Sequence, residues 1–154
     1  MFLLLTLMPA GWPAFRTSYY VDMNDIPVGA RAEQRILVTG EVAIDFLGDP
    51  EARVLATPWM IAYMEWTSRD AILQHLSEGW DSVGTEVNVK HLAATPIGVA
   101  VRFEAEVLKV DGPRVLLRVD AWDEKEQVGT GTHERFVINI ARFKSRLAAK
   151  RSSA

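Results

Sequence analysis

The sequence predicts an α+β domain in which an antiparallel β-sheet curves around one long apolar helix. Only one segment, Ala56 to Gly79, combines helix-start and helix-stop signals with a long apolar run. Segments in which apolar and polar residues alternate strictly lie on both sides of it, and several are joined by turn signals. A chain of 154 residues with this pattern is most simply one domain with one core.

Composition excludes several classes of function. The chain is 49% hydrophobic and 24% charged, as in soluble globular proteins. A net charge of -3 argues against a nucleic-acid partner. Without cysteine there is no disulfide, thiolate nucleophile or Cys-ligated zinc, and the three histidines lack metal-ligand spacing. Phosphate-binding and dinucleotide-binding glycine motifs are absent too, so we expect neither a metal nor a cofactor.

The first 25 residues are interpreted as an N-terminal extension outside the domain. Their apolar run, Phe2–Met8, has no preceding basic residue, lacks a clear cleavage site and is too short to span a bilayer. We therefore expect an early start assignment, with Met23 as the natural first residue. Residues 26–147 are predicted as the single domain and 148–154 as a C-terminal tail, in a cytoplasmic protein without a membrane partner.

The predicted helix presents one carboxylate that needs an explanation. Thr57 is a suitable N-cap, Pro58 suits the first helical position, and Gly79 suits the end of the helix. From residue 59 to 66 every residue except Glu65 is apolar, which predicts a helix buried on nearly all sides. Burying a carboxylate without a partner costs several kcal/mol or raises its pKa, so Glu65 is a candidate functional residue.

The rest of the domain is predicted as strands and turns. Before the helix, Arg31–Phe46 is expected to form one strand bent at Gly40, followed by a turn-rich connection over Leu47–Leu55. Asp111-Gly112 is a strong hairpin signal. The alternating segments after the helix are Gly84–Thr95, Gly98–Val110, 113–121 and Val128–Ile140, followed by a basic, helical 141–150. Within the last strand, Gly129 and Gly131 leave bare backbone suited to close approach by a ligand or another chain.

Each candidate residue also has an ordinary structural interpretation. Glu65 could pair with Arg69 at i+4 on an exposed helix face, a contact worth about 0.3–0.5 kcal/mol. His91 shares the apolar face of its strand with two valines, where a histidine is often only a hydrogen-bonded core residue. Capping alone explains Thr57. The residue pattern leaves these alternatives open.

Three segments resemble a known family. VLATPWMIAYMEW, GTEVNVKHLAATPIG and VGTGTHERFVI are similar, in this order, to the signature segments of the fluoroacetyl-CoA thioesterase-like group of hotdog-fold thioesterases. The resemblance extends from about Ile26 to Leu147. It implies a hotdog fold, with the sheet wrapped around the central helix, and a homodimer that hydrolyses acyl-CoA thioesters. It further implies that Thr57, Glu65 and His91 form the catalytic set, that Gly84 offers a backbone N–H in the acyl pocket, and that Arg135 lies near that pocket.

The implied chemistry suits these residue types. Thioester hydrolysis needs a nucleophile or general base, stabilisation of the carbonyl oxyanion, and a proton for the leaving thiolate. A desolvated carboxylate could act as base or nucleophile, and the sequence leaves both routes open. A histidine facing Glu65 could hold it or transfer a proton near neutral pH, and Thr57 at the helix start would lie beside free backbone N–H donors.

The connection before the helix departs from the fluoroacetyl-specific pattern. It is shorter than the aromatic-bearing lid of the family's fluoroacetate-resistance member, and only Phe46 lies nearby. We therefore expect a small or medium acyl-CoA as substrate, without special preference for the fluorinated one. The main alternative is a non-catalytic hotdog dimer that binds acyl-CoA or a small ligand. A hotdog hydratase is less well supported, since no Asp-and-His pair stands out.

Overall fold

A computed structural model describes residues 26–152. The predicted N-terminal extension, residues 1–25, lies outside the described residues. The elements, in chain order, are β1 (Arg31–Leu37), the 3-10 helix η2 (Pro50–Ala52), α1 (Thr57–Leu73), β2 (Trp80–His91), β3 (Ala100–Asp111), β4 (Arg114–Trp122), β5 (Gln127–Asn139) and α2 (Ile140–Ser152). No helix in this described part combines the length and apolar character needed to cross a bilayer.

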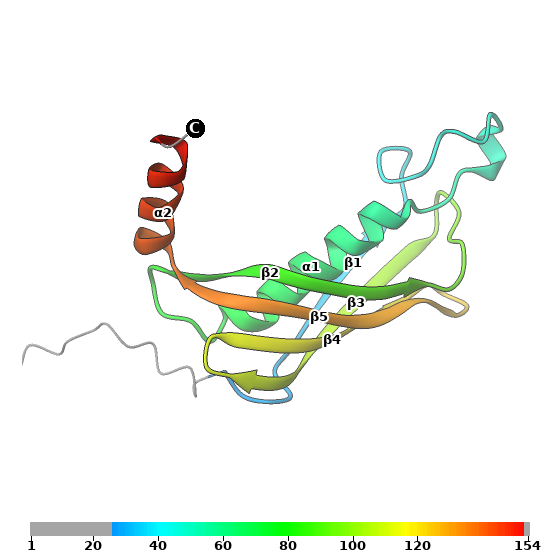
Figure 1. The fold of residues 1–154 in the computed structure, drawn as a ribbon. Coiled ribbons are helices and arrows are strands. Elements are labelled where there is room, and N and C mark those ends of the chain that lie inside the picture. Colours follow the sequence, from blue (N-terminus) through cyan, green and yellow to red (C-terminus); the bar gives the residue numbers. More distant parts are fainter. Residues whose placement is uncertain (1–25, 153–154) are drawn as a thin grey trace, which may run out of the picture.

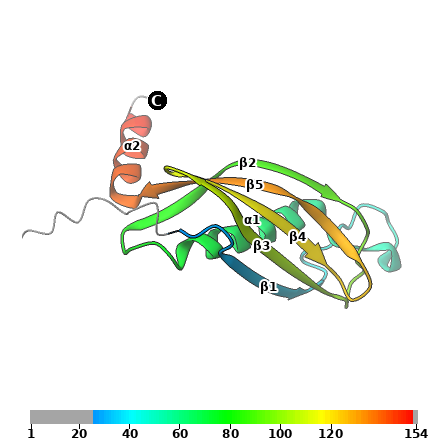
Figure 2. The same ribbon diagram turned by 90° about the horizontal axis from the view of Figure 1, so that it is seen from below.

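The five strands form one antiparallel sheet in the order β1-β3-β4-β5-β2, curved along α1 (Figure 1, Figure 2). One face packs against α1. The predicted alternation of β3 and β4 is confirmed, because their apolar residues form the core: Val101, Phe103, Ala105, Val107, Val115, Leu117, Val119 and Ala121. The opposite face carries charged residues in ion pairs, such as Arg31 with Glu106 at 3.1 Å. Both β1 and β2 are edge strands of the single chain.

Helix α1 is buried on one side only, and the prediction of burial on nearly all sides is wrong for the single chain. Met60 and Met64 face the sheet and are buried, whereas the side chains of Trp59 and Trp66 point outward and are 38% and 44% exposed. Gly129 gives the methionines their space, because a Cβ there would lie 2.6 Å from the Met60 sulfur. The bare backbone at this position therefore admits the protein's own helix.

The helix is shorter than predicted at its C-terminal end. It ends at Leu73 and not near Gly79, because the next turns tighten into i→i-3 hydrogen bonds, from His75 N–H to the carbonyl of Ile72 at 2.9 Å. Gly79 instead adopts a φ of +85° in the turn that leads into β2, a conformation that favours glycine. At the other end Ala56 is the N-cap and makes no side-chain cap bond, so Thr57 is the first helical residue, not the cap.

The segment before the helix is not one long strand. Only Arg31–Leu37 pairs in the sheet, and the chain then turns, returning as a single bridge between Ala43 and Leu55. Arg53 explains the break: its guanidinium donates to the carbonyls of Gly40 at 2.6 Å and Ile44 at 3.0 Å. A side chain thus satisfies backbone groups that a continuing strand would have satisfied in a ladder.

A β-bulge in β2 changes which residues share a face. The register shifts between Gly84 and Glu86, where Gly84 pairs with Arg135 and Val87 with His133. Simple alternation puts Gly84 on the face opposite His91, but the extra residue at Thr85 returns both to the side of the helix. The bulge therefore allows the two strand residues implied by the family resemblance to lie on one face.

Candidate functional site

Thr57 and His91 form the first of two polar groups beside α1. The hydroxyl of Thr57, in the first turn of the helix, lies 2.8 Å from Nδ1 of His91, the last residue of β2. The His91 Nε2 atom is buried and has no hydrogen-bond partner within residues 26–152. Burial lowers the pKa of His91, so the imidazole is neutral at pH 7. A neutral imidazole with one free ring nitrogen can hold a ligand or exchange a proton.

This pair lies in an open cleft of about 410 Å³. Its other walls are apolar and come from the segment before α1 and the chain after β2: Ile44, Phe46, Val54, Leu55, Leu92, Ala93 and Ala94. Phe46 is 76% exposed, so its ring stands at the rim of the cleft and not in the core. An apolar cleft lined also by one polar pair is the usual form of a small-molecule site.

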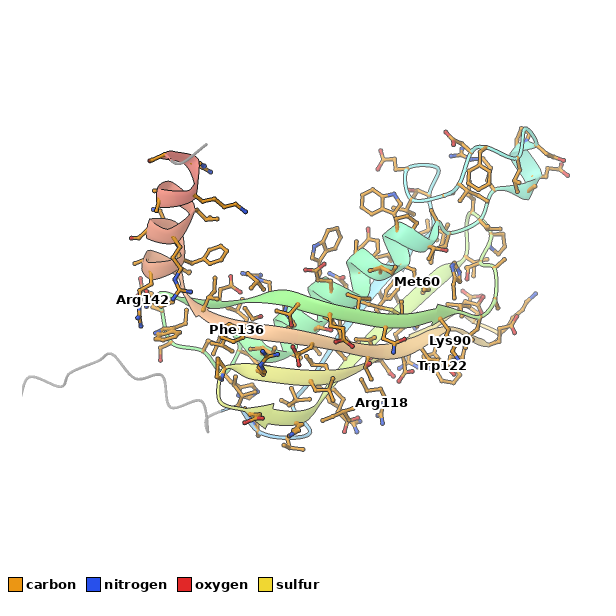
Figure 3. The ribbon with its side chains drawn as sticks, viewed as in Figure 1. Met60, Lys90, Arg118, Trp122, Phe136 and Arg142 are labelled. Atoms are coloured by element: carbon orange, nitrogen blue, oxygen red, sulfur yellow. The ribbon has the colours of Figure 1, made fainter. Side chains whose placement is uncertain are left out.

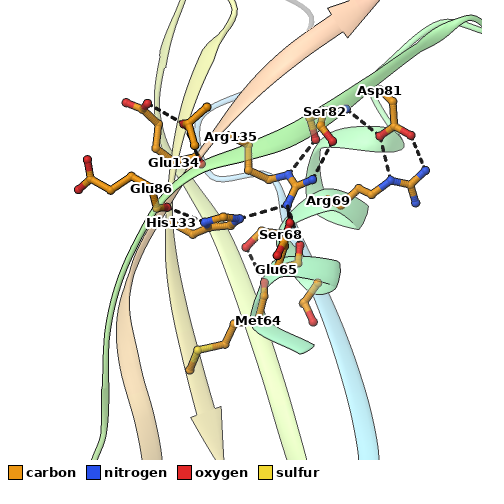
Figure 4. A network of polar contacts seen from close by, with 12 residues as sticks. Met64, Glu65, Ser68, Arg69, Asp81, Ser82, Glu86, His133, Glu134 and Arg135 are labelled. Atoms are coloured by element: carbon orange, nitrogen blue, oxygen red, sulfur yellow. Dashed lines mark hydrogen bonds and ion pairs between the residues drawn. The ribbon is translucent and has the colours of Figure 1, made fainter. Parts of the chain in front are cut away.

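Glu65 and Arg135 form the second group, two helical turns further along α1. Nη1 of Arg135 donates to the Glu65 backbone carbonyl at 3.1 Å and lies 3.5 Å from the carboxylate Oε1 (Figure 4). The expectation of a buried Glu65 is wrong for the single chain, in which its side chain is 43% exposed. Arg135 is 3% exposed, so the fixed and buried member of the pair is the arginine.

Arg135 is held from several directions. Its Nε donates to the Ser82 hydroxyl at 2.9 Å, its Nη2 donates to the Ser82 carbonyl at 2.7 Å, and its Nη1 lies 3.1 Å from Nε2 of His133. Burial lowers the pKa of Arg135, and the neighbouring Glu65 opposes this effect. A guanidinium fixed in this way presents its positive charge at one place beside α1.

His133 and Ser82 belong to the site and were missed by the sequence analysis. Arg135 donates to Nε2 of His133, which leaves the ring proton on Nδ1, where it is donated to the Glu86 carbonyl at 2.7 Å. The pKa of His133 is lowered, chiefly by burial, which favours this neutral form. Strand alternation offered a signal for His133, because residues 133 and 135 must face the same way. Ser82 lies two residues before Gly84 and so also faces the same way, but the predicted strand began only at Gly84.

Gly84 on β2 lies close to the carboxylate of Glu65. A Cβ placed on Gly84 would lie 2.9 Å from Cε1 of His133 and 3.1 Å from Oε1 of Glu65. Only glycine allows strand β2, the carboxylate and the imidazole to approach this closely. The structure therefore brings together Glu65, Gly84 and Arg135, three of the five residues singled out in the sequence.

The alternative interpretation of Glu65, a surface ion pair with Arg69, differs from the structure. Arg69 does not pair with Glu65; it donates from Nε and Nη2 to both oxygens of Asp81, at 2.8 and 2.6 Å. The expectation that His91 faces Glu65 also differs from the structure, where the hydrogen bond of His91 goes to Thr57. Glu65 lies eight residues after Thr57 on the helix, about 12 Å along the axis. One chain thus carries two groups of candidate residues, not one assembled set.

Comparison with known proteins identifies the family. Residues 38–141 match the model of the fluoroacetyl-CoA-specific thioesterase family. The fluoroacetyl-CoA thioesterase of Streptantibioticus cattleyicolor is 41% identical over 106 residues, which cover 69% of this chain and 75% of that protein. The chain belongs to this thioesterase family. The prediction of a thioester hydrolase is confirmed.

Solved structures agree on the fold. A thioesterase superfamily member from Thermus thermophilus superposes with a TM-score of 0.74 at 34% identity, covering 84% of this chain and 98% of the other. A variant of the fluoroacetyl-CoA-specific thioesterase, in complex with fluoroacetate and CoA, superposes with a TM-score of 0.68 at 36% identity, covering 76% and 98%. The predicted α+β hotdog fold is confirmed by these neighbours.

Proposed function

We propose that the protein hydrolyses small or medium acyl-CoA thioesters with Thr57, Glu65 and His91 as catalytic residues. Gly84 and Arg135 would bind the substrate beside Glu65. The observation that carries this proposal is the position of the Glu65 carboxylate, with one oxygen against the backbone of Gly84 and beside the buried Arg135 guanidinium. A thioester carbonyl lying along β2 at Gly84 would meet both the carboxylate and a backbone N–H.

In this mechanism Glu65 starts the reaction from its ionised form. It either attacks the thioester carbon, to give an acyl–carboxylate intermediate that water then opens, or takes a proton from the attacking water. In both routes the C–S bond breaks and the CoA thiolate takes up a proton. With Glu65 as base, the acyl group gains its new oxygen directly from water. With direct attack, water opens the intermediate at the Glu65 carbonyl, which restores the carboxylate with a water oxygen and leaves a former Glu65 oxygen in the acid. A single turnover in ¹⁸O-labelled water detects that route as unlabelled acid.

Thr57 and His91 would serve the same reaction from the other side of the substrate. The Thr57 hydroxyl lies in the first turn of α1, where unpaired backbone N–H groups favour negative charge. His91, with Nδ1 on that hydroxyl and Nε2 free, is suited to orient it and to pass a proton to the leaving thiolate. This arrangement requires the two groups to face one substrate.

We infer that two subunits bring the groups together. Strand β2 is a 12-residue edge strand with an exposed stretch from Gly84 to Asn88, and an open edge favours pairing with another copy. Beside it, the exposed outer side of α1 carries the aromatic pair Trp59 and Trp66, with ring centroids 6.4 Å apart. Antiparallel pairing of two β2 strands about a twofold axis near Val87 would bring the Gly84 end of one to the His91 end of the other.

The substrate range follows from the cleft beside His91. Its rim carries one exposed phenylalanine, Phe46, and its walls are otherwise aliphatic or small. Such walls accept an extra methylene or fluorine with little discrimination, of the order of 10–200-fold. We therefore propose an enzyme for small or medium acyl-CoA, with fluoroacetyl-CoA favoured over acetyl-CoA by less than about a hundredfold. We also propose that the enzyme is cytoplasmic.

Turnover by a Glu65→Gln variant tests this function. The amide keeps the shape of the side chain but removes its charge and basicity, so thiol release should fall by about 10²-fold or more across acetyl-, fluoroacetyl-, butyryl- and hexanoyl-CoA. The matched control is Asp70→Asn, an exposed carboxylate on the same helix, which should keep wild-type rates. A folded Glu65→Gln enzyme with more than half of wild-type activity would remove Glu65 from the mechanism.

A further inference from the structure

A second cavity, of about 220 Å³, lies where α2 leaves the sheet. It is separate from the cleft beside His91 and shares no residue with it. Its walls come from the start of β2, the end of β5 and the first two turns of α2: Trp80, Phe136, Val137, Ile138, Asn139, Arg142, Phe143 and Arg146. Figure 1 shows α2 standing away from the sheet at this end, and Figure 3 labels Phe136 and Arg142 beside the junction.

The base of α2 is fixed to the sheet. The backbone N–H of Arg142 donates to Oδ1 of Asn139 at 3.1 Å, and the backbone N–H of Ile140 donates to the Gly79 carbonyl at 2.9 Å. The first bond satisfies an N–H at the start of the helix, and the second ties the helix to the turn before β2. The cavity therefore has a defined position relative to β2 and β5.

The charge of α2 has one sign. The helix carries five basic residues and no acidic one, although the chain has a net charge of -3. None of the five makes an ion pair within residues 26–152, and no acidic residue lines the cavity. Arg142 and Arg146 are four residues apart, on the same face, and both line it.

Aromatic rings complete the cavity. Phe136 and Phe143 line it together with Arg142 and Arg146, and Trp80, which packs against the core on the helix face of the sheet, borders it. Rings stack on flat bases, and arginines bind phosphate oxygens through paired N–H donors. A polyanion with a planar ring system matches this lining, whereas an acyl chain alone gives the arginines no partner.

We propose that this cavity binds the 3′-phosphorylated ADP portion of the acyl-CoA substrate, with Arg142 and Arg146 on phosphates and the aromatic residues against adenine. The proposal rests on the proposed function, since it takes acyl-CoA as the substrate. It assigns α2, which lies outside the groups of Thr57 and Glu65, to substrate binding.

The distance to the proposed reaction centre fits this assignment. Trp80 lies four residues before Gly84 on β2, and Asn139 lies four residues after Arg135 on β5. Four extended residues span about 13 Å. The pantetheine arm, with its two amide bonds, spans on the order of 15 Å when extended. A nucleotide in the cavity can therefore deliver its thioester to the Gly84 and Glu65 of the same subunit.

Paired substrates with and without the nucleotide test the proposal. We compare kcat/KM for acetyl-CoA with that for S-acetylpantetheine in the wild type, in Arg142→Ala/Arg146→Ala, and in Lys144→Ala/Arg151→Ala. The last variant loses two charges from α2 residues that do not line the cavity. The ratio of acetyl-CoA to acetylpantetheine efficiency should fall about tenfold or more in the arginine variant, the effect of losing a charge-assisted hydrogen bond, and stay at the wild-type value in the control.

Inhibition by 3′,5′-ADP gives a second measurement. It should compete with acetyl-CoA in the wild type and in the control variant, and bind about tenfold more weakly in the arginine variant. An equal loss on both substrates, or an equal effect of both double variants, would overturn the proposal. Wild-type enzyme that hydrolyses neither substrate would instead refute the proposed function, so the two failures can be told apart.

Discussion

Replacing Gly84 with alanine tests the geometry around Glu65 by adding a single methyl group. The new Cβ would lie 2.9 Å from Cε1 of His133 and 3.1 Å from Oε1 of Glu65. His133 is buried and hydrogen-bonded through both ring nitrogens, so it has little freedom to withdraw. Glu65 has 43% of its side chain exposed and should be the group that moves.

The size of the effect follows from these contacts. The methyl group would lie about 0.5 Å closer to His133 than ordinary van der Waals contact allows. Overpacking of this kind costs about 1–3 kcal/mol, and the gain from removing a glycine in a strand, about 0.5–1 kcal/mol, offsets part of it. We expect unfolding to cost about 1 kcal/mol less than in the wild type. We also expect kcat to fall about 10²-fold, because a misplaced reacting group loses that much.

The assay is acetyl-CoA hydrolysis together with urea unfolding followed by circular dichroism. Gly40→Ala is the matched control, because its Cβ would meet only the end of the flexible Arg53 side chain, at 3.2 Å. That variant should keep wild-type kcat. Gly84→Ala with wild-type stability and more than half of wild-type kcat would refute the close approach of β2 to Glu65 and His133.

Two further predictions concern Arg135 and the histidines. Arg135→Lys should lower the free energy of unfolding by about 2 kcal/mol and should lower kcat at least about tenfold, because one ammonium group cannot reach Ser82, Glu65 and His133 together. The control is Arg69→Lys. Equal urea midpoints for the two variants would contradict this prediction. Burial lowers the pKa of His91 and of His133, so below about pH 6.5 the unfolded chain binds more protons than the folded one. The free energy of unfolding should therefore fall as pH drops through that region, and kcat/KM should fall with it. The control variant His75→Ala should show the same fall of kcat/KM on the acid side of the pH profile.

Much of the sheet could be predicted because its strands follow a strict two-residue period. The buried positions of β3 and β4 are the apolar positions of that pattern, and Asp111-Gly112 forms the turn between them, with Gly112 at a φ of +54°. The first residues of α1 were also predictable, because Pro58 pre-sets the helical φ. These features depend on local sequence, which is why the sequence was sufficient.

The predictions that were wrong depend on contacts between residues that are far apart in the sequence. The end of β1 depends on Arg53, which donates hydrogen bonds to the carbonyls of Gly40 and Ile44, 13 and 9 residues away in the sequence. The bulge at Thr85 moves Gly84 to the face of His91, and alternation alone cannot reveal an inserted residue. The exposure of Glu65 depends on what covers the outer side of α1, and in the single chain that side is open to solvent.

The candidate site was predictable in its members more than in its arrangement. Glu65 stood out as the one charged residue in an apolar helical run, and Gly84 and Arg135 lie beside it in the structure. His133 completes their network through a hydrogen bond that connects two strand residues with a helix. Pairings of this kind come from tertiary packing, so the pattern of one segment does not contain them.

Mixing of inactivated subunits tests most directly whether two subunits share each proposed active site. Glu65→Gln and His91→Ala, each of which the proposed mechanism predicts to have little activity alone, are unfolded together and refolded into mixed dimers. If Glu65 of one subunit works with His91 of the other, each mixed dimer contains one intact site. Random assortment should then restore about a quarter of wild-type activity. Refolded, dimeric mixtures with no more activity than the separate variants would contradict the shared site.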